Sequence, residues 1–128
     1  KAEAGENAIQ TALREAEEEI GVHQPDVKVI GQLSDFNVIP SNFLVTPIVG
    51  ALNYVPVFKP DPREVDKIIS AALTDLIRED AVYEEEILAG GLYPMIAPHF
   101  LIEGEIVWGA TAMMLNEFRM VVREIFKV

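Results

Sequence analysis

Three glutamates near the start of the chain, Glu15, Glu18 and Glu19, have the residue type and spacing of a divalent-metal site. On an α-helix, which turns about 100° per residue, Glu18 lies roughly 60° to one side of Glu15 and Glu19 roughly 40° to the other. The three carboxylates would share one face, where like charges repel and destabilise the helix. A bound divalent cation would remove this repulsion. Because the chain has no cysteine, oxygen ligands and therefore Mg²⁺ or Mn²⁺ are favoured.

The alternative is that this acidic run is an ordinary solvated helix face, which is the more common origin of such runs. The residues around the run decide between the two interpretations, because many of them stand at fixed spacings from it. These are Gly5, Glu6, Arg14, Ala16, Gly21 and Val22.

The whole pattern resembles the Nudix box, G-x5-E-x7-R-E-U-x-E-E-x-G-U, in which U is an apolar residue. The positions in register are Glu6, Arg14, Glu15, Ala16, Glu18, Glu19, Gly21 and Val22. The opening glycine of the box would fall immediately before Lys1, and the first strands of the family would precede it. We therefore expect an N-terminally truncated Nudix domain, with an unpaired sheet edge and an incomplete pocket.

The resemblance implies a role for each box residue. Glu18 and Glu19 resemble direct metal ligands, and Glu15 resembles a further ligand or the base that orients the attacking water. Arg14 is expected to hold a carboxylate by a bidentate bond, as its equivalent does in the family. Glu6 is either structural or a partner of the ligands. Glu15, Arg14 and Glu18 are thus the predicted catalytic residues, and no substrate-binding residue is predicted.

Some members of the family use a further acid outside the box. The candidates in this chain are Glu64, Glu84, Glu85, Glu86 and Glu103, although each is more often a solvated residue than a catalyst. The two histidines, His23 and His99, lack the spacing of a ligand pair, and we expect both to be structural or loop residues.

Hydrophobic patterning predicts mixed helices and strands. Apolar residues at helical spacing predict helices over residues 6–20 and 110–126, the first of which ends at Gly21. Runs of apolar and β-branched residues predict strands over residues 27–33, 43–52, 82–88, 95–102 and 105–108. Turn chemistry is expected at residues 37–42, 90–91 and 103–104. The buried side of the last helix is predicted to consist of Met114, Phe118, Val121, Val122 and Ile125.

Three further stretches resemble the coenzyme A pyrophosphatase-like branch of the family, at residues 39–47, 60–65 and 107–112. The resemblance implies a strand over residues 64–71 and a short helix over 73–78, although periodicity alone predicts one helix over 64–80. Trp108 is expected in the core, and Thr111 as a capping or first-turn residue. The basic, histidine-containing segment of this branch precedes the box and is not in this sequence.

The substrate implied is coenzyme A or acyl-CoA, hydrolysed to 3′,5′-ADP and (acyl-)4′-phosphopantetheine. Two alternatives stay open. One is a Nudix hydrolase of another nucleotide diphosphate such as ADP-ribose, and the other is a non-catalytic binding module with the Nudix fold. All these substrates are small molecules bearing a diphosphate.

Composition sets wider limits. A chain of 128 residues, half of them hydrophobic, suits a single α/β domain over residues 1–128. The fold implied by the resemblance is a Nudix-type α/β/α sandwich around a mixed sheet. A formal charge of −11 argues against nucleic acid or an anionic membrane as a partner. With no membrane span or secretory pattern, we expect a cytoplasmic protein, either a monomer or a homodimer.

Overall fold

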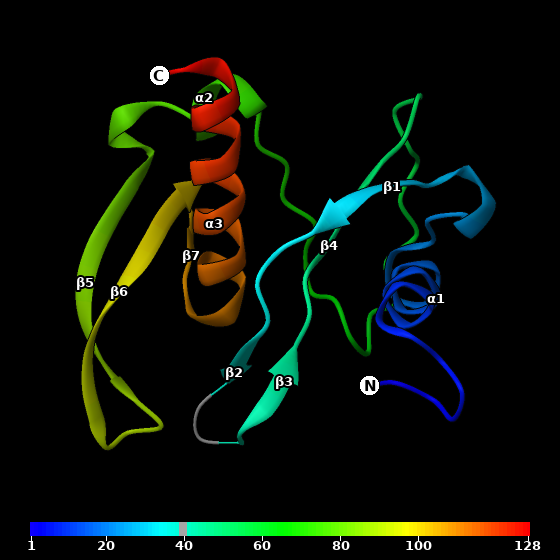
Figure 1. The fold of residues 1–128 in the computed structure, drawn as a ribbon, viewed down its shortest axis with the longest axis horizontal. Coiled ribbons are helices and arrows are strands. Elements are labelled where there is room, and N and C mark those ends of the chain that lie inside the picture. The colour runs from blue at the N-terminus through cyan, green and yellow to red at the C-terminus, as the bar shows by residue number, and fades with distance from the viewer. Residues whose placement is uncertain (39–40) are drawn as a thin grey trace. The chain divides into compact units, whose positions relative to one another are not determined.

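The computed structural model describes residues 1–38 and 41–128, which form two compact units (Figure 1). The first unit comprises Lys1–Leu33 and Thr46–Ile68, and the second comprises Ser34–Val45 and Ile69–Val128. Ile39 and Pro40 lie outside the described residues, so the predicted turn at 37–42 and the family-like stretch at 39–47 are described only in part. The single-domain prediction stays a prediction.

The first unit is built around helix α1 (Ala8–Ile20), followed by a 3₁₀ turn, η1 (Gln24–Asp26). The helix begins two residues later than predicted because Asn7 caps it. The Asn7 side chain accepts a hydrogen bond from the Gln10 N–H at 2.8 Å, and the Gln10 side chain accepts one from the Asn7 N–H at 3.0 Å. Gly21 ends the helix as predicted, in the left-handed region at φ 75°.

Two short strands complete the first unit, β1 (Lys28–Gln32) and β4 (Ile48–Ala51), which pair antiparallel with a register shift between Val29 and Gly31. The predicted single strand over residues 43–52 is wrong. It is divided into β3 (Phe43–Val45) and β4, because Pro47 has no N–H with which to continue a ladder. The Pro47 carbonyl instead accepts the Leu33 N–H at 3.0 Å.

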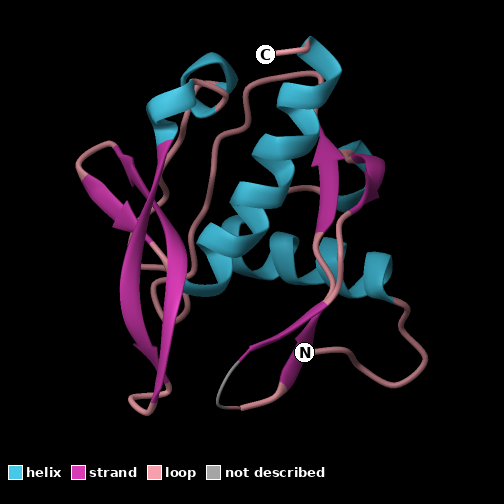
Figure 2. Ribbon diagram, turned by 60° about the vertical axis from the view of Figure 1, so that its left-hand side comes forward, coloured by secondary structure: helices cyan, strands magenta, loops and turns pink. Residues whose placement is uncertain are grey.

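In the second unit, β3 pairs antiparallel with β2 (Phe36–Val38), a strand that the sequence pattern did not predict. A short helix α2 (Leu73–Leu76) and a 3₁₀ turn η2 (Glu79–Ala81) follow. Strands β5 (Val82–Ala89), β6 (Tyr93–Ile102) and β7 (Glu105–Val107) then form an antiparallel sheet in the order β5-β6-β7 (Figure 2). Its two hairpin turns lie at the predicted glycine positions, with positive φ at Gly90, Gly91 and Gly104.

The last helix, α3 (Gly109–Phe126), packs on this sheet, and the core beneath it contains Leu76, Phe100, Val107 and Ala112. Its predicted buried side is only partly right. Val122 is buried and Met114 and Phe118 are half-buried, but Val121 and Ile125 are 43% and 69% exposed.

The buried stripe of α3 is rotated from the predicted one, and Ala112 and Arg119 lie in it. An arginine in this position carries no hydrophobic signal, which explains the error. Trp108, expected in the core, is 62% exposed at the N-cap of α3. Thr111 lies in the first turn of α3, as predicted.

Residues 64–71 form no strand, contrary to the prediction from the resemblance. The N–H groups of Glu64 and Val65 instead donate to the Asp61 carbonyl at 3.0 and 2.8 Å, which makes a turn. The short helix after them is confirmed, although it ends at Leu76 rather than Arg78.

The α/β class is confirmed, and every strand pair in the described part of the chain is antiparallel. Among the described residues, no helix has the length and apolar character needed to cross a membrane.

Candidate active site

A cavity of about 590 Å³ in the first unit gathers the predicted metal ligands. Its lining from α1 and the residues before that helix is Lys1, Arg14, Glu15, Glu18 and Glu19. Its lining from the loop after β4 is Asp61, Arg63 and Glu64. The structure thus brings the three box carboxylates to one cavity and adds two acids and one arginine that lie some forty residues further along the chain.

Backbone contacts attach this second lining segment, residues 59–65, to the C-terminal end of α1. The Lys59 N–H donates to the Ile20 carbonyl at 2.9 Å, and the Asp61 N–H donates to the Glu19 carbonyl at 2.8 Å. Gly21 permits the close approach, because a Cβ at this position would lie 2.9 Å from the Lys59 Cβ. The glycine that ends the helix therefore also admits the loop.

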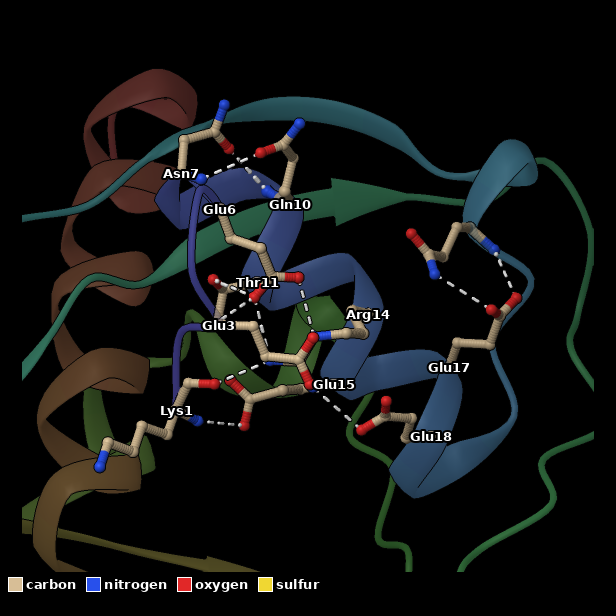
Figure 3. Close-up of polar contacts among 11 residues, drawn as sticks. Lys1, Glu3, Glu6, Asn7, Gln10, Thr11, Arg14, Glu15, Glu17 and Glu18 are labelled. Carbon is tan, nitrogen blue, oxygen red and sulfur yellow. Dashed lines mark hydrogen bonds and ion pairs between the residues drawn. The ribbon is translucent and has the colours of Figure 1, made fainter.

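Arg14 organises the polar contacts at the other side of the cavity (Figure 3). Its Nε and Nη2 donate to the two carboxylate oxygens of Glu6 at 2.8 and 3.1 Å, and its Nη1 donates to Glu18 Oε2 at 3.1 Å. The bidentate partner is therefore Glu6, while Glu18 receives a single bond. This arrangement makes Glu6 a partner of the residue that holds Glu18.

The Arg14 guanidinium lowers the pKa of Glu6 to about 2, with further hydrogen bonds from the Glu3 N–H and the Thr11 hydroxyl. In return, Glu6 raises the pKa of Arg14. The side chains of Glu6 and Arg14 are only 17% and 19% exposed, so this pair is more enclosed than an ordinary surface ion pair.

The three predicted ligands differ in their surroundings. Glu15 Oε2 lies 3.0 Å from the backbone nitrogen of Lys1, and the Glu18 side chain is 60% exposed. Glu19 has a raised pKa, first because of burial and then because of the negative charges of Glu15 and Glu64. Burial and like charge thus both disfavour the ionised form of the Glu19 carboxylate.

These residues fit a hard divalent cation by their chemistry. All of them supply carboxylate oxygens, and a cation would offset both the burial of the Glu19 charge and its repulsion by Glu15 and Glu64, which together raise the Glu19 pKa. Across residues 1–38 and 41–128, however, no three acidic or histidine side chains are already close enough together to coordinate an ion. The ligand roles of Glu15, Glu18 and Glu19 stay predictions.

The other sequence candidates are divided between the two units. Glu64 lines the cavity with the box carboxylates. Glu84, Glu85 and Glu86 are exposed on β5, and Glu103 lies at the β6–β7 turn, all in the second unit.

Neither histidine lines the carboxylate cavity. His23 Nδ1 lies 3.5 Å from Glu17 Oε2 before η1. His99 is buried, with Nδ1 3.0 Å from the Ala97 carbonyl and its ring against Tyr83.

Sequence reasoning assigned no role to Asp61 or Arg63, although both line the cavity. The available signal was the family-like stretch at residues 60–65, which indicated a branch of the family but no chemistry. Spacing could not reveal these residues, because the contacts that bring them to α1 are made by backbone groups.

The sequence profile of the NUDIX domain matches residues 1–88 of this chain. The chain is 32% identical over 109 residues to a protein of Photorhabdus laumondii named uncharacterized Nudix hydrolase NudL, covering 85% of this chain and 57% of that protein. It is 35% identical over 81 residues to the peroxisomal coenzyme A diphosphatase NUDT7 of Mus musculus, covering 63% and 34%. It is 29% identical over 117 residues to the mitochondrial coenzyme A diphosphatase NUDT8 of Homo sapiens, covering 90% and 49%. The chain thus spans about half the length, or less, of these curated relatives.

Proposed function

Because this chain belongs to the Nudix family, we propose that it is the metal-dependent hydrolytic part of a pyrophosphatase acting on nucleoside-diphosphate-linked substrates. The observation that carries the proposal is the cavity that Glu15, Glu18 and Glu19 line together. Crowding of carboxylates in one cavity is destabilising without a cation and suits a protein that binds one.

Glu18 and Glu19 would hold Mg²⁺ or Mn²⁺, with Glu15 as a third ligand or as the base. A bound metal of this kind lowers the pKa of a water molecule and neutralises charge that develops on a diphosphate. Glu15 would orient the attacking water and accept its proton. Arg14, fixed by its two bonds to Glu6, would keep the Glu18 carboxylate in place through the third.

Within this class we propose coenzyme A or acyl-CoA as the substrate. Water would attack one phosphorus of the diphosphate, and cleavage of the P–O–P bond would give 3′,5′-ADP and (acyl-)4′-phosphopantetheine. The support is that two similar proteins are named coenzyme A diphosphatases. A cytoplasmic location and a homodimer stay predictions.

A substrate panel with the intact protein tests both levels of the proposal. Coenzyme A and ADP-ribose are incubated separately with Mg²⁺ or Mn²⁺, and the products are separated by chromatography. Release of 3′,5′-ADP from coenzyme A, abolished by a chelator, is the expected result. Release of AMP from ADP-ribose alone would move the substrate to the other nucleotide diphosphates. Metal-dependent binding of a nucleotide without turnover of either compound would instead indicate the non-catalytic module.

A further inference from the structure

The charges of the cavity pose a problem for any diphosphate substrate. Acidic residues outnumber basic ones in its lining, with Glu15, Glu18, Glu19, Asp61 and Glu64 against Lys1, Arg14 and Arg63. A diphosphate is itself polyanionic, so it meets repulsion from every carboxylate that a metal does not occupy. A cationic side chain at the cavity would complement the metal, and the three basic residues of the lining differ in how freely their side chains could do so.

Two of the three basic side chains are poorly placed. The Arg14 guanidinium is already bonded to Glu6, to Glu18 and to the Lys1 carbonyl. The Lys1 side chain extends away from Glu15, while its backbone atoms face that residue (Figure 3). Arg63 is the remaining cation.

The Arg63 guanidinium is held in place on one side and accessible to solvent on the other. Its Nε donates to Asp61 Oδ1 at 3.1 Å and its Nη2 to Asp61 Oδ2 at 2.9 Å, while the Arg63 side chain remains 86% exposed. A guanidinium carries five N–H donors, so these bonds leave three without a partner among the described residues. The planar fork that remains suits bidentate binding of phosphate oxygens.

Asp61 can hold the Arg63 guanidinium in place because its own backbone and its carboxylate both make further hydrogen bonds. Its N–H is bonded to the Glu19 carbonyl of α1, and its carboxylate also accepts the Arg63 N–H at 3.0 Å. The Asp61 side chain is only 20% exposed, and Arg63 lowers its pKa, so the acid stays ionised and keeps its hold on the guanidinium.

We propose that Arg63, positioned by Asp61, binds the diphosphate oxygens of a nucleotide substrate at the carboxylate cavity. This inference rests on the proposed function and adds a substrate-binding residue to it. It predicts that Arg63 contributes to substrate affinity rather than to the chemical step, because it is not one of the predicted ligands or the base.

The chain contains a matched control in the second unit. Arg78 and Asp80 form an ion pair of the same length, 2.9 Å, also between residues two apart, and the Arg78 side chain is 62% exposed. This pair does not line the carboxylate cavity. Loss of a generic arginine–aspartate pair can therefore be separated from loss of a phosphate contact.

The experiment compares the wild-type protein with Arg63→Ala, Arg63→Lys and Arg78→Ala. The probe is α,β-methylene-ADP with Mn²⁺, a nucleoside diphosphate whose bridging carbon resists hydrolysis, and its dissociation constant is measured by calorimetry. We expect Arg63→Ala to weaken binding about tenfold, which corresponds to loss of a charge-assisted contact. Arg63→Lys should fall between, because an ammonium cannot make the bidentate contact. Arg78→Ala should bind as the wild type does.

Steady-state kinetics on the substrate found by the panel gives a second readout. Arg63→Ala should raise KM about tenfold and leave kcat within about threefold of the wild type. If the wild type is active and Arg63→Ala has the same dissociation constant and KM as the wild type, this inference is overturned and the proposed function stands. Equal weakening in Arg63→Ala and Arg78→Ala would also overturn it. Failure of the wild type to hydrolyse any compound of the panel would instead contradict the proposed function.

Discussion

Arg14 in the first unit and Arg119 in the second are both largely removed from solvent, and they use the guanidinium in opposite ways. Arg14 is bonded mainly to carboxylates, those of Glu6 and Glu18. Arg119 is bonded to the backbone carbonyls of Leu76, Arg78 and Glu79 at 3.0, 2.5 and 3.3 Å. The first arginine arranges charges beside a cavity, and the second satisfies the backbone of a short helix and turn.

The two arrangements have different electrostatic consequences. In the first unit, the Arg14 charge lowers the pKa of Glu6, while the neighbouring Glu19 keeps a raised pKa. In the second unit, burial lowers the pKa of Arg119, and no carboxylate bonded to its guanidinium is found in the described residues. Arg123 adds a bond to the Ile77 carbonyl next to this cluster. In the first unit the guanidinium is therefore paired with acids beside the proposed site, whereas in the second unit it is paired with backbone carbonyls.

The largest effect should follow from Glu18→Gln, which places a neutral amide where the first unit is proposed to bind metal. We expect hydrolysis to fall about a hundredfold or more, because an amide binds a hard cation far more weakly than a carboxylate does. Activity and the circular-dichroism spectrum are measured together, and the spectrum should not change.

The matched control is Glu17→Gln on the same helix. Glu17 is bonded to Gln24 and does not line the cavity, so its replacement should leave the rate within about twofold. If Glu17→Gln and Glu18→Gln lost the same fraction of the hydrolysis rate, the acids that line the cavity would not differ in function from Glu17.

A second substitution, Arg119→Met, tests the structural half of the comparison. It leaves the three carbonyls without the guanidinium in a buried position, and we expect the free energy of unfolding to fall by about 2–4 kcal/mol. Urea denaturation followed by circular dichroism measures this change. Arg78→Ala, at an exposed arginine, should cost less than about 0.5 kcal/mol. A loss this small in Arg119→Met would mean that water replaces the guanidinium without cost.

The pH dependence of stability tests the Arg14–Glu6 pair. The Glu6 pKa is lowered from an ordinary value of 4.5 to about 2, so the folded state favours the ionised form. The resulting stabilisation is complete above about 4.5 and is lost as the pH falls from there through about 2. Thermal melting across this range should show a steeper fall in the wild type than in Glu6→Gln. Parallel curves would show that the pair adds no stability.

The smallest effect is expected from Glu19→Gln in metal-free protein, and its sign is opposite to that of the Glu6 pair. A raised carboxyl pKa means that ionisation destabilises the fold at neutral pH, so a neutral amide should stabilise it. We expect a gain of about 0.5 kcal/mol, or about 2 °C in the melting temperature at pH 7 in the presence of a chelator.

Adding Mn²⁺ should then raise the melting temperature of the wild type more than that of Glu19→Gln, because the variant lacks one proposed ligand. Glu17→Gln, which loses its bonds to Gln24, should be slightly less stable than the wild type in both conditions. A lower melting temperature for metal-free Glu19→Gln would show that Glu19 has a structural partner and is not a strained acid.

Much of the fold could be predicted because its signals are local. Glycines at positive φ mark both hairpin turns of the β5-β6-β7 sheet, and apolar periodicity located α1 and α3 to within two residues at each end. The errors came from non-local partners. The resemblance implied a strand over residues 64–71, yet these residues form no strand, and the N–H groups of Glu64 and Val65 donate to the Asp61 carbonyl in a turn. The exposed Trp108 likewise depends on what packs around it.

The sequence by itself determined the common face of Glu15, Glu18 and Glu19, because helical periodicity, the Asn7 cap and the Gly21 end act within a few residues. Only the tertiary structure decided that Asp61, Arg63 and Glu64 line the same cavity. It also decided that Arg14 donates two hydrogen bonds to Glu6 and that Arg119 is buried. The physical reason is the same for the loop and for Arg119. Both depend on backbone carbonyls as acceptors, and a carbonyl is present at every residue, so the sequence carries no mark of which one is used.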